Sequence, residues 1–180
     1  MGEKETSGLY RRLRDKFWFR WAMDLGIIAL IFFAFSAYQT RNLIDRSAPL
    51  PPATLISLDG EELSFDDLNQ RRTVIYFWAT WCGACSLQSG AISSLHSRAE
   101  KREDLEVISV VLHYQSEEQV RAFVKENQID YPVYLGTPGV AASFNIDIFP
   151  TVYIVDSERR VRHGLAGYTT GLGLRARLLL

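Results

Sequence analysis

The fold of this chain can be predicted from one segment, Val74-Ile75-Tyr76-Phe77-Trp78-Ala79-Thr80-Trp81-Cys82-Gly83-Ala84-Cys85. Its first five residues are β-branched or aromatic, as in a buried strand. The residues that follow it place Leu87, Ala91 and Leu95 at helical spacing. Cys82 is therefore expected at a junction between a strand and a helix.

Cys82 and Cys85 are the only two cysteines of the chain, and their spacing favours thiol–disulfide exchange. Free amide groups and the positive end of the dipole at a helix start favour a thiolate, so Cys82 is the predicted nucleophile. Cys85 lies three positions later, within bridging distance, and is the predicted resolving residue. The pair is the predicted redox-active disulfide.

Two other readings of the cysteine pair are weaker. A zinc site needs four ligands, and the three histidines, His96, His113 and His163, are scattered without ligand spacing. We therefore expect no metal at the pair and assign these histidines no role. A purely structural disulfide closing so short a loop would remove little entropy from the unfolded chain.

The composition indicates one compact domain with an appendage. The chain has 180 residues, 47% of them hydrophobic, and a net charge of −1. This length supports a substantial core, and the balanced charge gives no indication of nucleic-acid binding.

The appendage is the N-terminal region, where the uncharged, apolar segment Leu25–Thr40 follows a basic stretch that contains Arg11, Arg12, Arg14, Lys16 and Arg20. A bilayer core requires roughly twenty residues, which residues 17–40 supply. By the positive-inside rule, residues 1–16 would stay in the cytoplasm and everything after Thr40 would cross the membrane. A cleaved signal peptide and a buried core helix are the alternatives.

Prolines at positions 49, 51 and 52 predict an extended linker over residues 41–52, followed by the main domain over residues 53–180. Within this domain strands alternate with helices, which predicts an α/β fold with helices on both faces of the sheet. The expected elements are a hairpin of Thr54–Leu58 and Glu61–Phe65, a helical turn at Asp66–Asn69, strands at Val107–Leu112, Tyr131–Leu135, Val152–Val155 and Arg160–Gly167, and helices at Glu117–Glu126, Val140–Phe144 and Gly171–Leu180.

The segment from Ala53 to Leu180 resembles the thioredoxin fold, because it combines the WCxxC junction with Phe149-Pro150-Thr151 before an apolar strand. More narrowly, it is similar to the membrane-anchored TlpA/DsbE-like thioredoxins of the bacterial envelope. The matching segments are Leu58–Ser64, Tyr76–Cys82 and the additional strand and helix between Val107 and Tyr134. The Cys-Gly-Ala-Cys motif and the short chain are most similar to the suppressor-of-copper-sensitivity thioredoxins.

The resemblance implies that Pro150 follows a cis peptide bond and faces the cysteines, with Phe149 offering backbone groups to substrate. From the sequence alone, a strand-edge proline is the alternative. Trp81 is the expected surface residue of a substrate-binding set completed by Phe149 and Pro150. Thioredoxins usually have a buried Asp where Tyr76 stands, and a tyrosine is a poor base at neutral pH, so Tyr76 is not expected to be catalytic.

The leading functional hypothesis is a single-pass protein of the bacterial inner membrane whose thioredoxin-like domain faces the periplasm. It would reduce disulfides of envelope proteins without a cofactor, and a membrane thiol–disulfide electron donor would reduce the pair again. A disulfide oxidase or isomerase would use the same two cysteines.

Two further hypotheses belong to different classes. Two soft thiolates can bind Cu(I), and the copper-sensitivity resemblance suggests copper tolerance, but both methionines precede the linker. An inert adaptor with a thioredoxin fold would not need the intact reactive junction.

Overall fold

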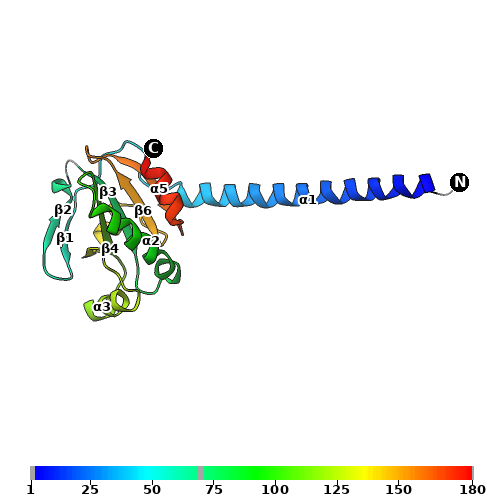
Figure 1. Cartoon of the computed structure of the whole chain (residues 1–180). Helices are drawn as coiled ribbons and strands as arrows, with labels where there is room; N and C mark the ends of the chain where they lie inside the picture. The colour runs from blue at the N-terminus through cyan, green and yellow to red at the C-terminus, as the bar shows by residue number, and fades with distance from the viewer. Residues whose placement is uncertain (1–2, 69–70, 180) are drawn as a thin grey trace. The chain divides into compact units, whose positions relative to one another are not determined.

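The computed structural model describes residues 3–68 and 71–179, in one compact unit ending at Arg41 and a second beginning at Asn42 (Figure 1). The first unit is the single helix α1 (Glu3–Thr40). Its segment Arg20–Thr40 is long and apolar enough to cross a membrane. Large apolar side chains along this segment, including Ile31 and Phe33, are exposed. A signal sequence would share these properties, so they are weak support for a membrane span.

The second unit contains all the strands. They are β1 (Thr54–Ser57), β2 (Glu62–Ser64), β3 (Arg72–Trp78), β4 (Leu105–Val111), β5 (Val133–Leu135), β6 (Thr151–Val155) and β7 (Val161–Ala166). The helices are the 3-10 turn η1 (Phe65–Asp67) and α2 (Gly83–Ala99), α3 (Glu117–Glu126), α4 (Pro138–Ser143) and α5 (Gly171–Leu179).

The strands form a seven-stranded sheet in the order β2-β1-β5-β4-β3-β6-β7. The pairs β3–β4 and β4–β5 are parallel, whereas β1–β2, β1–β5, β3–β6 and β6–β7 are antiparallel. The sheet is therefore mixed and central, which confirms the predicted α/β thioredoxin fold.

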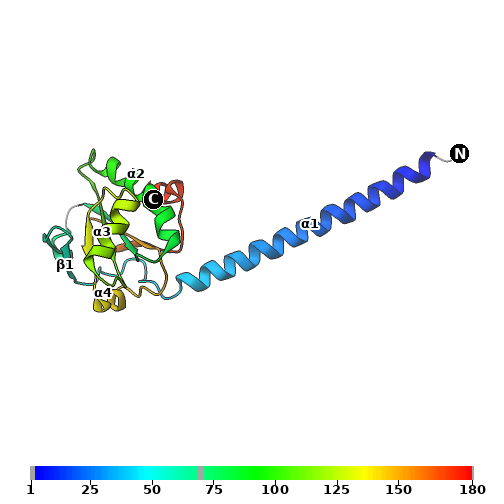
Figure 2. The same cartoon turned by 90° about the horizontal axis from the view of Figure 1, so that it is seen from below.

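The strand β3 is buried on both faces because its side chains alternate between two apolar clusters. Val74, Tyr76 and Trp78 join the cluster that contains residues of α2, α3 and α5. Ile75 and Phe77 join the cluster that contains residues of α4 and η1. Figure 2 shows α2 and α3 on one side of the sheet and α4 on the other. This two-sided burial explains the continuous apolar run in the sequence.

Residues 42–52 pack against the domain, whereas the prolines predicted an extended linker over residues 41–52. The amide groups of Ser47 and Leu50 donate hydrogen bonds of 2.7 and 2.8 Å to the carbonyl oxygens of Val161 and Arg159. The side chain of Leu50 is buried, and Ile44 packs against the same cluster. The segment is a strap along the edge of β7, and the compact unit begins at Asn42, well before Ala53.

Most predicted elements lie where expected, with small differences. The β1–β2 hairpin and α3 are confirmed. The strand β5 begins at Val133 instead of Tyr131. The helix α4 begins at Pro138, in its first turn, instead of Val140. The predicted turn at Asp66–Asn69 is η1 as far as Asp67, and Asn69 lies outside the described residues.

The spacing argument for α2 was wrong at Leu87, whose side chain is 77% exposed. The buried face of α2 includes Cys85, Gln88, Ile92 and Leu95 instead.

Candidate active site

Cys82 is the N-cap residue of α2, placed there by the short connection from the end of β3. Its main-chain amide donates to the carbonyl oxygen of Ala79 at 3.1 Å. The amide of Cys85 donates to the Cys82 sulfur, also at 3.1 Å. A sulfur at this position accepts an amide hydrogen bond and experiences the positive end of the helix dipole, both of which stabilise a thiolate.

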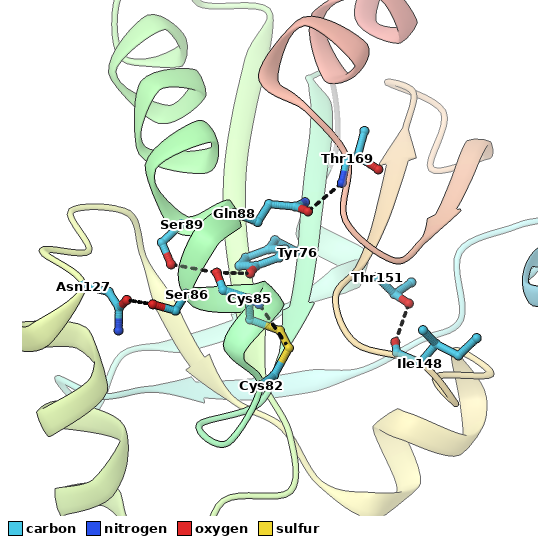
Figure 3. Close-up of a disulfide and its surroundings, with 10 residues drawn as sticks. All are labelled: Tyr76, Cys82, Cys85, Ser86, Gln88, Ser89, Asn127, Ile148, Thr151 and Thr169. Atoms are coloured by element: carbon cyan, nitrogen blue, oxygen red, sulfur yellow. Dashed lines mark hydrogen bonds between the residues drawn. A yellow bond between two sulfur atoms is a disulfide. The ribbon is translucent and has the colours of Figure 1, made fainter. Parts of the chain in front are cut away.

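Cys82 and Cys85 form a disulfide with an S–S distance of 2.06 Å (Figure 3). The two residues differ in access, because Cys82 is 6% exposed and Cys85 is completely buried. A substrate sulfur approaching from solvent therefore meets Cys82 first.

Side chains from two elements hold the backbone of Cys85. The hydroxyl of Tyr76, on β3, donates to the carbonyl oxygen of Cys85 at 3.1 Å. The hydroxyl of Ser89, one turn along α2, donates to the same oxygen at 2.9 Å. Figure 3 shows both donors converging on this oxygen. They fix the position of the second cysteine relative to the sheet.

Burial raises the pKa of Tyr76 far above its ordinary value, and the neighbouring Tyr131 raises this pKa further. Tyr76 is thus a neutral hydrogen-bond donor at physiological pH and does not act as a base. Its place in the buried core agrees with the sequence expectation.

Gln88 is a buried polar residue that the sequence analysis missed. Its side-chain oxygen accepts a 2.8 Å hydrogen bond from the amide of Thr169, in the segment between β7 and α5 (Figure 3). Its side-chain nitrogen has no hydrogen-bond partner among the described residues. The burial of Gln88 could have been predicted from its position three residues after Cys85, on the face of α2 that also carries Ile92 and Leu95.

The structure brings the predicted substrate-binding residues to the same edge of the sheet as the cysteines. The antiparallel register pairs Phe77 with Thr151, so the segment before β6 lies beside the end of β3. The bond between Phe149 and Pro150 is cis, as the resemblance implied. Trp81 is 65% exposed, and its ring meets that of Phe149 edge to face at 5.6 Å between centroids.

His113, to which we assigned no role, lies on this aromatic surface. Its ring centroid is 5.7 Å from that of Phe149, so Phe149 contacts both His113 and Trp81. Trp78, in contrast, is buried and stacks on Phe123 at 4.6 Å. The accessible ring beside the cysteines is therefore Trp81, as expected.

No group of three or more His, Cys, Asp or Glu residues suited to hold a metal ion occurs in the described part of the chain. The arrangement at Cys82 is suited to reversible exchange between a dithiol and a disulfide.

Comparisons with known proteins agree with this geometry. Residues 47–164 match the model of the AhpC/TSA family. A thioredoxin-like protein of Haemophilus influenzae is 32% identical over 127 residues, which cover 69% of this chain and 72% of that protein. The thiol-disulfide oxidoreductase ResA of Oceanobacillus iheyensis is 26% identical over 175 residues, which cover 93% and 90% of the two chains.

Solved structures share the fold. A thiol:disulfide interchange protein, DsbE, from Chlorobium tepidum superposes with a TM-score of 0.69 at 18% identity, covering 76% of this chain and 96% of that one. StoA from Bacillus subtilis gives a TM-score of 0.62 at 21% identity, covering 73% and 98%. The similarity to TlpA/DsbE-like proteins is confirmed, whereas the copper-sensitivity subtype stays a prediction. The chain belongs to the AhpC/TSA family, among its thioredoxin-like thiol–disulfide oxidoreductases.

Proposed function

We propose that this protein is a membrane-tethered disulfide reductase of the bacterial envelope that works through Cys82 and Cys85. The observation that carries the proposal is the difference between the two sulfurs. Cys82 is at the helix N-cap and keeps 6% of its surface exposed, while Cys85 is completely buried. This is the arrangement expected of a nucleophile and a resolving residue.

The cycle begins with the reduced pair. The Cys82 thiolate attacks a substrate disulfide, a mixed disulfide forms, and one substrate thiolate leaves. Cys85, after losing its proton, attacks the Cys82 sulfur and displaces the second substrate thiolate. The substrate gains two electrons and two protons, and the Cys82–Cys85 disulfide seen in the structure is the product. Because Tyr76 is not a base, the Cys85 proton passes to water or to a departing substrate thiolate.

The surface around Cys82 supports recognition of an extended substrate segment. Trp81 and Phe149 offer aromatic faces, and Pro150 removes one amide donor from the segment before β6. Residues with free backbone groups beside a cis proline can pair with a substrate strand. We assign Trp81, Phe149 and Pro150 to substrate binding on this basis.

The proposed location rests on α1 and on its charge pattern. The basic N-terminus would stay in the cytoplasm as residues 1–16, and residues 17–40 would span the inner membrane. The domain from Asn42 onward would then face the periplasm, where no soluble thiol pool keeps cysteines reduced. A membrane thiol–disulfide transporter is therefore the proposed electron donor, and disulfide-containing envelope proteins are the proposed substrates.

Mixed-disulfide trapping tests the roles of the two cysteines. A Cys85→Ala variant should accumulate covalent complexes with envelope proteins. A reductant should cleave the mixed disulfides and release these proteins. The matched control, Cys82→Ala, should accumulate none, since its remaining sulfur is buried. Equal trapping by both variants, or by neither, would contradict the assignment.

A further inference from the structure

Two adjoining cavities lie away from the cysteines, and Arg72 lines both of them. One has a volume of about 390 Å³ and the other about 620 Å³. We use the name basic edge for the lining cations that form no ion pair with a described side chain, which are Arg46, Arg72, Arg98, Lys101, Arg175 and Arg177.

The basic edge lies at the opposite end of the sheet from the disulfide. Arg72 begins β3, and the cysteines follow the other end of that strand. Arg98 is in the last turn of α2, whose N-cap is Cys82. A helix of 17 residues is about 25 Å long, so this surface is distinct from the active site.

Acidic side chains neutralise this surface only in part: Asp104, Asp156 and Glu158 line the same cavities, and Asp104 also interacts with the charge of Arg72. Two neighbouring arginines, Arg102 and Arg162, form ion pairs with Asp104 and Asp156 at 2.6 and 2.7 Å. The six residues of the basic edge form no ion pair with any described side chain, and the hydrogen bonds found for four of them go to uncharged partners. These partners are the carbonyl oxygens of Leu178 and Gly173, the Ser94 hydroxyl and the His163 ring.

The ionisation of His163 reflects the same excess of positive charge. Its pKa is lowered from the ordinary value, first by burial and then by the charges of Arg46 and Arg177. Like charges held together repel one another, and a bound anion would relieve that repulsion.

The smaller cavity also has apolar walls. Leu95, Leu105 and Leu178 line it together with Arg98 and the other cations. A small inorganic anion gains nothing from leucine walls. A molecule that joins a phosphate to apolar carbon matches both parts of the lining.

The short chain connection limits how far Arg46 can lie from the proposed membrane segment. Only Arg41 separates the end of α1 at Thr40 from the compact unit at Asn42. Arg46 follows Thr40 by six positions in the sequence. Six extended residues span at most about 20 Å, so Arg46 cannot lie farther than that from the end of the helix.

We propose that the basic edge binds the headgroups of anionic phospholipids in the membrane that α1 spans. The inference rests on the membrane topology proposed above. Binding at this edge would hold the opposite edge, with Cys82, pointing away from the lipid and toward substrates in solution. Each cation near an anionic surface adds to the attraction, so several acting together can fix one orientation.

The test uses the full chain in lipid nanodiscs that carry nitroxide-labelled headgroups, with leucine methyl NMR as the readout. One set of discs is phosphatidylcholine, and the other contains phosphatidylglycerol as a quarter of its lipid. In the anionic discs, relaxation of Leu105 and Leu178 should increase strongly, while Leu87, near the cysteines, should not respond.

A charge-reversal variant identifies the residues responsible. Arg98→Glu with Lys101→Glu should lower the ratio of docked to undocked domain by at least about 30-fold, since the loss of two cations alone accounts for that factor and the two introduced carboxylates add repulsion from the anionic lipid. The control, Arg121→Glu with Lys125→Glu on α3, makes the same charge change elsewhere and should leave docking intact.

Four outcomes would overturn the inference in distinguishable ways. Equal relaxation in both disc types, or no effect of the Arg98 and Lys101 changes, would contradict lipid binding while leaving the topology intact. Inorganic phosphate that shifts the Leu105 and Leu178 signals in phosphatidylcholine discs would indicate a site for free anions. A chain that fails to co-elute with discs would contradict the proposed membrane topology itself.

Discussion

The hydroxyl group of Tyr76 donates a 3.1 Å hydrogen bond to the main-chain carbonyl oxygen of Cys85. This bond links β3 to α2 directly beneath the disulfide. The same carbonyl oxygen accepts a second bond from Ser89, so two side chains fix the buried cysteine. Tyr76 is therefore a neutral hydrogen-bond donor at the position where thioredoxins usually have a buried Asp.

Replacing Tyr76 with Phe should lower the free energy of unfolding by about 1 kcal/mol, the usual net contribution of one hydrogen bond. Burial raises the pKa of Tyr76, so its hydroxyl stays protonated across the working range, and the pH profile of exchange should be unchanged. Chemical denaturation measures the free energy of unfolding, and exchange rates between roughly pH 6 and 9 give the pH profile. Ser89→Ala is the matched control, and a profile altered only in Tyr76→Phe would show that Tyr76 moves a proton.

The two thiols should differ in their reaction with an alkylating reagent. Cys82 in a Cys85→Ala variant should react rapidly near neutral pH, because the helix start stabilises a thiolate there. Cys85 in a Cys82→Ala variant should react slowly and only at higher pH, since burial disfavours the thiolate. Mass spectrometry of samples quenched over time gives both rates. The reverse order would assign the nucleophile to Cys85.

Trp81→Ala should impair exchange with protein disulfides more than exchange with a small aromatic disulfide. An aromatic contact of this kind contributes about 1 kcal/mol, so kcat/KM for a protein substrate should fall roughly five- to tenfold. Stability should change little, because the ring is 65% exposed. Ile56→Ala, which removes an exposed apolar side chain on β1, serves as the control. A similar loss for both substrates would place Trp81 in the chemical step instead of in recognition.

Leu50→Ala should destabilise the domain by about 2–5 kcal/mol if the strap over residues 42–52 is part of the folded unit. Leu50 is buried in the cluster beside β7, whereas the neighbouring Pro52 is exposed. Pro52→Ala is therefore the control. Thermal or chemical unfolding of Leu50→Ala and Pro52→Ala gives the two changes in stability. A negligible effect of Leu50→Ala would mean that this segment is the spacer suggested by its prolines.

The junction at Cys82 could be predicted from the sequence because its signals are local. A run of β-branched and aromatic residues, a helical pattern and the two cysteines occupy one short stretch. The cis bond before Pro150 could be predicted only from the resemblance to thioredoxins, since it depends on a distant part of the fold.

Other features depend on contacts between distant segments and could not be predicted. The prolines of residues 49–52 gave no indication that Ser47 and Leu50 would pair with the edge of β7. The exposure of Leu87 and the burial of Gln88 follow from where α5 and β3 pack on α2, which helical spacing alone does not determine. The basic edge gathers cations from the strap, β3, α2 and α5, so it exists only in the folded chain.

The proposed function requires Cys82 and Cys85 to act as a reductant in the envelope. The most direct measurement is their redox state in intact cells, by acid quenching followed by alkylation with a mass-shifting thiol reagent. We expect a mainly reduced pair that becomes oxidised when the membrane electron supply is removed. A pair that is mainly oxidised in cells with an intact supply would contradict the reductase assignment.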